Sequence, residues 1–263
     1  MDRLSILGLL LGVVSLGAGA AFKKLPILAT FWNPAAFSIV IVGTVAAISL
    51  QTPPAALKRA LQMLVWIFRP PLVQNAALIE RIVDWSRAAR RKGLLALESE
   101  VAKEQDPFIR RGLELVYDGA AADTVRKVME VEMGARQAAD TAGAKVYEGM
   151  GIYAPTLGII GAVLGLMAVM GNLQNQAALG DGIKAAFTAT IYGIGLANLF
   201  FLPVSNKLKQ HIAVQAHSRD MIVDGLAAIA DGENPRIIEA KLQGYVLDGT
   251  KRSTAPLPEG DRP

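Results

Sequence analysis

Residues 153–167 read YAPTLGIIGAVLGLM, and this stretch carries no charged side chain. It lies inside a charge-free run from Gly149 to Gly180, and a second run extends from Ala185 to Asn206. An apolar run of about 18 or more residues predicts a membrane-spanning helix, because about 20 helical residues cross the hydrocarbon core. Residues 4–22 and 25–57 form two more such runs. Four runs are too many for the buried helices of a soluble domain, so the sequence predicts an all-α, polytopic membrane protein with four transmembrane helices and a helical cytoplasmic domain.

The composition excludes several classes of protein. Of the 263 residues, 52% are hydrophobic and 19% are charged, against about 25% charged in soluble domains. The net charge is only +4 and the basic residues are mixed with acids, so no nucleic-acid partner is expected. There is no cysteine and there are only two histidines, which argues against disulfides and metal sites. We expect no cofactor, no catalytic residue and no enzymatic activity.

The chain divides into four parts along its length. Residues 1–50 hold transmembrane helices 1 (Leu4–Phe22) and 2 (Ala35–Leu50). Residues 51–147 form a polar, helical block, residues 148–206 hold helices 3 and 4, and residues 207–263 form a tail. The tail beyond Asp248 is polar and proline-rich, which predicts disorder over about the last 15 residues.

Charge counts predict the orientation in the membrane. The 51–147 block carries 15 Lys/Arg and 12 Asp/Glu, whereas the opposite side receives only Lys23, Lys24, Asp181 and Lys184. The positive-inside rule therefore places the block and both termini in the cytoplasm. The first run could be a signal peptide, but Lys23 and a second span follow at once, so we interpret it as a retained helix.

The polar block is expected to be helical. A helix over 76–91 should stop at Gly93, Asp106 should cap a helix that Gly119 closes, and the helix from Ala122 to Tyr147 should continue into span three. Asn234-Pro235 opens a helix in the tail. The apolar positions with helical spacing are Leu78, Ile79, Ile82, Val83 and Trp85, then Val125, Val128, Met129 and Val131, and in the tail Ile237, Ile238, Leu242 and Val246.

No span contains Asp, Glu, Lys, Arg or His. Ion pathways normally need an intramembrane ionisable group, so either the chain transports nothing or a partner subunit supplies the acid. Gly158, Gly161 and Gly165 form a small-residue ridge suited to helix packing. Pro155 and Pro203 free backbone carbonyls that a neighbouring helix or cavity must satisfy.

Arg87, Arg90, Arg91 and Lys92 form a basic cluster, which Glu98, Glu100 and Glu104 follow. The cluster could be a solvated helix face or a contact with anionic membrane lipid. It could also be a charged docking surface, where complementary fields set register and association rate.

Four segments together resemble the MotA/PomA family of flagellar motor stators. They are AARRKGLLALE (88–98), YAPTLGIIGAVLGLM (153–167), TATIYGIGLANLFFLPVSNKL (188–208) and IADGENPRIIEAKL (229–242). The resemblance implies an ion-conducting, torque-generating subunit in the bacterial inner membrane. It implies a pentamer of this chain around a dimer of a single-span, peptidoglycan-anchored partner of the MotB/PomB type, which fits the missing acid.

The resemblance also implies roles for single residues. Arg90 and Glu98 match loop charges that engage the rotor switch protein. Pro155 and Pro203 match two prolines that flank the ion path and couple protonation to movement of the loop, and Thr190 matches a threonine near the partner's ion-carrying aspartate. Where the sodium-driven branch has a second threonine, this chain has Ala162, which offers no oxygen to a sodium ion. Protons are therefore the expected transported ion, with Na⁺ as the alternative.

Two other classes of membrane protein share some of these features. Energisers of outer-membrane processes of the ExbB/TolQ type are similar in spans three and four, but they have one span before the loop where this chain has two. A solute transporter or membrane enzyme would show charges within a span or an inverted repeat, and the sequence shows neither.

Overall fold

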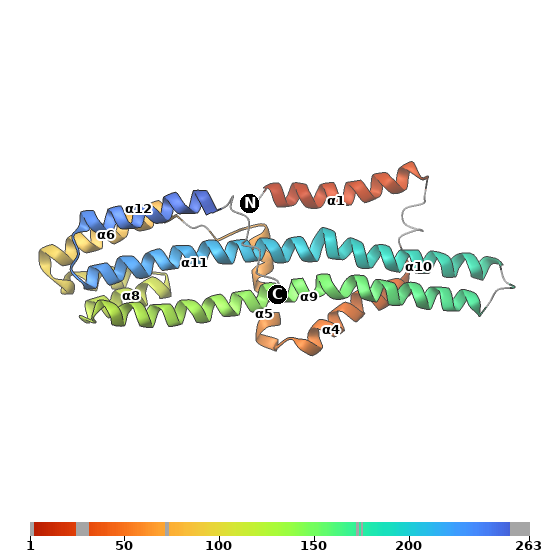
Figure 1. Cartoon of the computed structure of the whole chain (residues 1–263), viewed down its shortest axis with the longest axis horizontal. Coiled ribbons are helices and arrows are strands. Elements are labelled where there is room, and N and C mark those ends of the chain that lie inside the picture. The colour runs from red at the N-terminus through yellow and green to blue at the C-terminus, as the bar shows by residue number, and fades with distance from the viewer. Residues whose placement is uncertain (1–2, 25–31, 72–73, 172–173, 175, 253–263) are drawn as a thin grey trace, which may run out of the picture. The chain divides into compact units, whose positions relative to one another are not determined.

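The computed structural model describes residues 3–24, 32–71, 74–171, 174 and 176–252, and within these residues every regular element is helical (Figure 1). The chain forms two compact units. The first unit comprises Met1–Pro71 and Ala139–His211, and the second comprises Leu72–Ala138 and Ile212–Pro263.

The first unit contains the four predicted spans. Span one is α1 (Arg3–Phe22), and span two is built from α3 (Pro34–Phe37), the π-helical turn η1 (Ser38–Val42) and α4 (Gly43–Gln51). Span two begins where the side chain of Asn33 accepts a hydrogen bond of 3.0 Å from the Ala36 N–H. Among the residues that the structure describes, four helices are long and apolar enough to cross a membrane, which confirms the predicted number of spans.

Spans three and four belong to two long helices. Helix α9 is continuous over 49 residues from Ala122 to Met170, which confirms that the helix predicted from Ala122 runs into span three. The other comprises α10 (Gln176–Leu196), the π-helical segment η4 (Ala197–Phe201) and α11 (Leu202–Ala230). Figure 1 shows α9 and α10 side by side.

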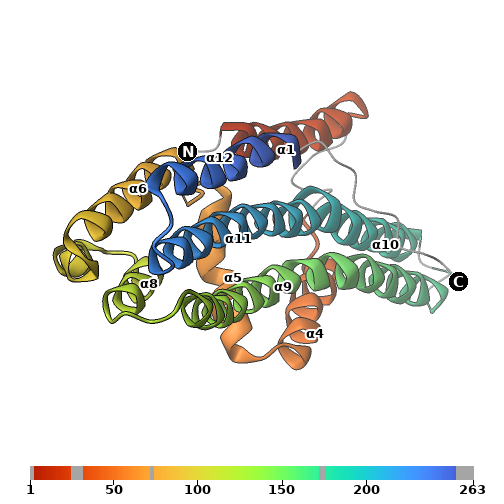
Figure 2. The same ribbon diagram turned by 60° about the vertical axis from the view of Figure 1, so that its left-hand side comes forward.

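A short amphipathic element that was not predicted separately follows span two. Helix α5 (Pro54–Met63) and the 3₁₀ turn η2 (Leu64–Ile67) run across α9 (Figures 1 and 2). The Tyr147 hydroxyl donates to the Ala60 carbonyl at 2.9 Å, and Arg59 pairs with Asp140 at 2.6 Å. These contacts join residues 54–71 to the part of α9 that contains Asp140 and Tyr147, and the compact units divide at 71/72, 138/139 and 211/212 rather than at the ends of the spans.

The second unit is a helical domain with a large apolar core. It contains α6 (Asn75–Lys92), the 3₁₀ turn η3 (Leu94–Leu97), α7 (Glu98–Lys103), α8 (Pro107–Tyr117) and α12 (Pro235–Arg252), with the remaining parts of α9 and α11. Helices α6 and α12 pack together, as Figure 2 shows. The largest fully buried core side chains are Ile82, Leu97, Phe108, Leu113, Met129, Met221, Leu226, Ile238 and Leu242.

The predicted stop and start signals of the second unit are confirmed. Gly93 ends α6 with φ 82° and Gly119 follows α8 with φ 75°, both in the left-handed region that glycine tolerates. Asp106 caps α8, since its carboxylate accepts a 2.8 Å hydrogen bond from the Phe108 N–H.

Some apolar positions were assigned to the wrong face. Val125 and Met129 of α9 are buried one turn apart, but Val131 is 74% exposed. In α12, Ile238 is buried while Ile237 is 59% exposed. In each case neighbouring apolar residues in the sequence lie on different sides of the helix, because only positions three or four apart share a face.

The polar tail was expected to be disordered beyond Asp248. The structure continues α12 beyond Asp248 to Arg252. The rest of the segment expected to be disordered, residues 253–263, lies outside the described residues.

Candidate functional site

Spans three and four approach each other through glycines. A methyl group added to Gly158 would lie 2.9 Å from the carbonyl oxygen of Ala189, and one added to Gly193 would lie 2.5 Å from that of Ala154. One added to Gly161 would lie 2.7 Å from the Ala189 methyl. These distances are shorter than van der Waals contact, so the backbones can be this close only because the side chains are hydrogen atoms. The predicted ridge of Gly158, Gly161 and Gly165 thus faces span four.

Pro155 and Thr190 lie at this interface. The added methyl on Gly193 would be 3.1 Å from the Pro155 Cα, and that on Gly158 would be 3.5 Å from the Thr190 Cα. Both side chains are half-buried. The Thr190 hydroxyl donates to the Ala186 carbonyl at 3.1 Å, so its oxygen can still accept a hydrogen bond. The structure therefore brings these two predicted residues together.

Ala162 lies one helical turn beyond Gly158 on α9 and is half-buried. It shares a face of α9 with Pro155, because positions seven apart are almost in line along a helix. Its methyl group provides no ligand for a metal cation. The interface between spans three and four therefore has Thr190 as a hydroxyl donor and acceptor, but no second hydroxyl at position 162.

Pro203 lies apart from Thr190, at the start of α11, and its side chain is exposed. The turn before it is π-helical, with the Leu202 N–H donating to the Ala197 carbonyl. Proline has no N–H, so the regular ladder cannot continue through this position, and the wider turn accommodates the defect. The sequence predicted a freed carbonyl here but not a π-helical segment. Pro155, in contrast, lies within an uninterrupted α-helix.

Charges flank these spans but do not enter them. Glu148 of α9 pairs with Lys209 of α11 at 2.8 Å, just outside the two charge-free runs. At the other end, Asp181 and Lys184 are exposed. Among the described residues no group of three His, Asp or Glu side chains could hold a metal ion.

The second predicted site lies in the second unit. Arg90 is in the last turn of α6 and Glu98 is the first residue of α7, and both side chains are exposed. Between them the chain turns at Gly93 and anchors itself through Leu97, which is fully buried. Glu104 at the end of α7 is buried and pairs with Arg81 of α6, and it also accepts a 2.8 Å hydrogen bond from the Asp106 N–H. The two exposed charges thus lie on a corner between α6 and α7 that Leu97 and Glu104 anchor to the rest of the unit.

The second unit also holds a charged cavity that the sequence analysis missed. It has a volume of about 430 Å³ and lies between α9, α11 and α12. Asp224 on its wall pairs with Arg126 at 2.5 Å and accepts a hydrogen bond from the Tyr245 hydroxyl. Burial would raise the pKa of Asp224, but the hydrogen bonds from Tyr245 and Arg126 outweigh it and lower that pKa. The only signal in the sequence was the spacing of four between Asp220 and Asp224.

Burial raises the pKa of Asp220 against the lowering effect of His217, and the nearby carboxylates of Asp224 and Glu130 raise it further. Asp220 and Asp224 are therefore one turn apart on α11, with pKa values shifted in opposite directions. The two pKa values shift in opposite directions because Arg126 and Tyr245 both donate hydrogen bonds to the carboxylate of Asp224.

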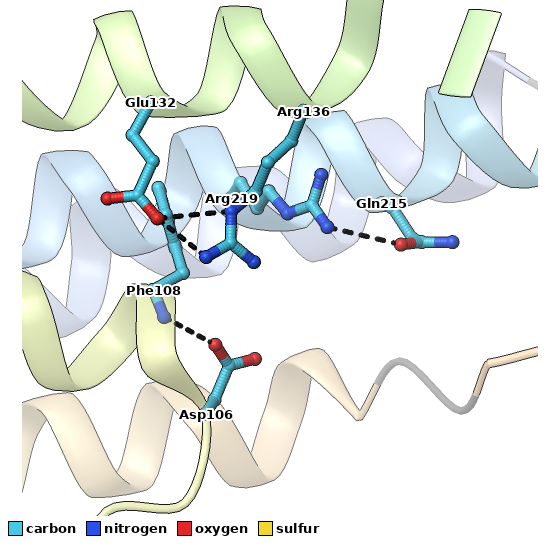
Figure 3. Close-up of polar contacts among 6 residues, drawn as sticks. All are labelled: Asp106, Phe108, Glu132, Arg136, Gln215 and Arg219. Carbon is cyan, nitrogen blue, oxygen red and sulfur yellow. Dashed lines mark hydrogen bonds and ion pairs between the residues drawn. The ribbon is translucent and has the colours of Figure 1, made fainter. Parts of the chain in front are cut away.

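Further polar side chains of α8, α9 and α11 lie near one another within the same unit, as Figure 3 shows. Glu132 accepts two hydrogen bonds from Arg136, at 3.1 and 2.6 Å, and the Arg136 guanidinium lies 5.8 Å from the centre of the Phe108 ring. Arg219 donates to Gln215 at 3.3 Å. This arrangement satisfies charges at the edge of a core and indicates a structural role.

Comparison with known proteins agrees with this architecture. Residues 100–221 match the model of the MotA/TolQ/ExbB proton channel family. The chain is 36% identical over 251 residues to motility protein A of Bacillus subtilis, covering 94% of this chain and 91% of that protein.

Two solved structures resemble the whole chain. The C. jejuni MotAB structure gives a TM-score of 0.87 at 30% identity and covers 93% of this chain and 96% of that chain. The flagellar MotAB stator complex from Bacillus subtilis gives 0.84 at 33% identity, covering 97% and 100%. The chain belongs to the MotA/TolQ/ExbB proton channel family, in its motility protein A branch.

Proposed function

We propose that this protein is the torque-generating stator subunit of a bacterial flagellar motor and that proton flow drives it. The observation that carries the proposal is the glycine-packed pair of spans three and four, which presents Thr190 and Pro155 but contains no acid. Conduction through such spans requires a titratable group from another chain. The matched structures are complexes of MotA with MotB, so a single-span, MotB-type subunit is the expected source of that acid.

The proton assignment rests on position 162. A sodium ion that leaves water needs replacement oxygen ligands, and Ala162 supplies none. Thr190 alone, with its hydroxyl already donated to Ala186, can accept one hydrogen bond from a hydrated proton or from the partner's acid.

The assembly is a pentamer of this chain around a dimer of the partner, in the bacterial inner membrane. The positive-inside rule puts the second unit and both termini on the cytoplasmic side. Arg90 and Glu98 then face the rotor switch protein, since both are exposed on a corner held by Leu97 and Glu104. Movement of the partner's acid is coupled to this corner through the long helices that contain Pro155 and Pro203.

Swimming speed measured across sodium concentrations, with and without a protonophore, tests the proton assignment. We expect speed to be independent of sodium and to vanish with the protonophore. Sodium-dependent swimming that survives the protonophore would refute it.

Reconstitution into vesicles tests whether the partner subunit supplies the titratable group. Vesicles that contain this subunit with its partner should take up protons, whereas vesicles with this subunit alone should show only the background leak. Equal flux in both would mean that the partner does not supply the titratable group.

A further inference from the structure

The segment from Pro54 to Arg69, which follows span two, has two chemically different flanks. One flank of α5 is apolar, with Leu57, Leu61 and Leu64 at helical spacing, and Leu61 is 71% exposed. The opposite flank holds Arg59 and Trp66, whose side chains stack at 5.1 Å. A helix with such separated faces is typical of elements that lie in the plane of a membrane surface.

The contacts of α5 place it at the edge of the apolar spans. It packs on α9 between Asp140, which pairs with Arg59, and Tyr147, which bonds to Ala60. The charge-free run of α9 starts at Gly149, only two residues beyond Tyr147. At about 1.5 Å per helical residue, α5 therefore lies within about 5 Å of the level where the apolar span begins. Helix α5 runs across α9 rather than along it (Figures 1 and 2), so its axis lies close to the membrane plane.

The ion pair shows which flank faces the lipid. Asp140 is nine residues before Gly149, so the Arg59 flank of α5 points away from the hydrocarbon. The flank of α5 with Leu57 and Leu61 is opposite and therefore points toward the acyl chains. Exposed leucine side chains are stable there, whereas in water they would form an unfavourable apolar patch.

The outer edge of this segment carries positive charge that the protein does not neutralise. Lys58 and Arg69 are exposed, and neither forms an ion pair with any residue that the structure describes. Of the described residues, the acids near this segment, Asp140 and Glu148, are already paired with Arg59 and Lys209. Two free cations on the rim of an apolar flank match the negative headgroups of acidic phospholipids.

We propose that residues 54–69 form an anionic-phospholipid binding surface, with Leu57 and Leu61 among the acyl chains and Lys58 and Arg69 at the headgroup phosphates. This surface does not depend on the coupling ion or on the rotor contact. It gives the stator subunit a preference for anionic lipids around the ends of spans two and three.

The native chain has no cysteine, so single labelling sites can be introduced into the full-length protein without other changes. A nitroxide on Leu61→Cys is expected to be accessible to oxygen and shielded from a water-soluble nickel reagent, as in a leaflet. The matched control is Gln62→Cys, the adjacent exposed residue on the Arg59 flank, whose label should show the reverse. If the water-soluble reagent reaches both labels equally, the segment does not lie in the leaflet and the proposal fails.

Lipid selectivity is tested with a fluorophore on Leu61→Cys in vesicles of equal parts phosphatidylglycerol and phosphatidylcholine, with bromine on one lipid or on the other. Brominated phosphatidylglycerol should quench more strongly. The double variant Lys58→Gln with Arg69→Gln should abolish the preference for phosphatidylglycerol. Each lost charge should lower the local affinity for this anionic lipid about fivefold. Lys23→Gln, an exposed lysine at the far end of span one, should leave it unchanged. Equal quenching by both lipids in the unsubstituted background would overturn the charge assignment, as would a preference that survives the double substitution.

Discussion

Gly193 in span four and Gly112 in the second unit are both closely packed, but they meet different atoms. A methyl group on Gly193 would lie 2.5 Å from a backbone oxygen, that of Ala154. One on Gly112 would lie 2.5 Å from the end of the Leu226 side chain and 2.6 Å from that of Met129. At Gly193 backbone lies against backbone, whereas at Gly112 flexible side chains fill the space.

The solvents explain this difference. Lipid tails are as apolar as leucine, so burying a large side chain between two spans gains little, and close backbone contact through small residues holds them together instead. The second unit is in water, where burying Phe108, Leu113 or Leu226 is strongly favourable. The spans should therefore tolerate loss of side-chain volume better than addition of it, and the second unit should show the opposite.

The largest loss of stability is expected from truncating the core of the second unit. Leu113→Ala removes a fully buried side chain and should cost about 2–5 kcal/mol, because the cavity cannot collapse completely. Hydrogen exchange of the α8 and α9 amides in the full-length protein measures this free energy. Leu95→Ala, at a position that is 71% exposed, is the control and should change it little. If the two variants behave alike, the core does not hold this unit together.

Adding one methyl group should lower the stability of the spans more than that of the second unit. Gly193→Ala should cost about 1–3 kcal/mol or more, because two backbones must move apart. Gly112→Ala should cost less, since Leu226 and Met129 can rotate. Thermal unfolding of the purified protein, together with its level in the membrane, checks this order.

Gly195→Ala is the matched control for span four, because a methyl group there has nothing within 4 Å. Gly195→Ala should be neutral or slightly stabilising, because alanine favours a helix more than glycine does. A loss of stability as large as that of Gly193→Ala would show that backbone contact does not set the cost.

Asp224 and Asp220 in the second unit should contribute to stability with opposite pH dependence. The pKa of Asp224 is lowered in the folded state, so its contribution is present above its unfolded pKa and is lost as the pH falls through its folded pKa. Asp224→Asn should therefore cost about 1.5–3 kcal/mol at neutral pH and nothing once the pH lies below the folded pKa. Hydrogen exchange of the α12 amides over a pH series measures it.

Asp220→Asn should act in the opposite direction. The pKa of Asp220 is raised from its ordinary 3.8, so the ionised form destabilises the fold, and stability falls as the pH rises through the interval between the two values. The asparagine variant should be more stable than the parent at neutral pH and equal to it in acid. A loss of stability at neutral pH would mean that the Asp220 carboxylate has a partner that favours its charge.

Much of this architecture could be predicted because it depends on local signals. Charge-free runs predict the spans. Asp106 and Gly93 mark helix ends, the first by capping and the second by its positive φ. Gly158 and Gly161 predict a closely packed helix face. The orientation of Val131 could not be read locally, because several helix faces carry apolar residues and only the tertiary structure decides which is buried.

The functional sites were less predictable for the same reason. The partners of Asp224 come from α9 and α12, 98 residues before it and 21 after it, and no local pattern connects them. The contact of α5 with Tyr147 joins residues 87 apart. The assignments of Arg90, Glu98, Ala162, Thr190 and the two prolines came from family resemblance, and their roles stay predictions.

The smallest effect on stability is expected at the predicted rotor contact. Arg90 and Glu98 are exposed and pair with none of the described residues, so reversing both charges, Arg90→Glu with Glu98→Lys, should change the free energy of unfolding by less than about 0.5 kcal/mol. Swimming should nevertheless fall sharply, because like charges would then face the rotor. Single neutral substitutions should reduce it only partly, since exposed ion pairs are worth about 0–1 kcal/mol each and neighbouring arginines remain.

The matched control for this last variant is the exposed pair Asp123 and Lys127 of α9, which also lies in the second unit and bonds at 2.6 Å. Its reversal, Asp123→Lys with Lys127→Glu, changes the same number of charges and should leave swimming intact. Both proteins must be present in the membrane at the parent level, because loss of the subunit would imitate loss of torque. Compensating reversals on the rotor should restore swimming only to the Arg90/Glu98 variant. If that variant swims normally at the parent level, these two charges are a solvated helix face and the torque contact lies elsewhere.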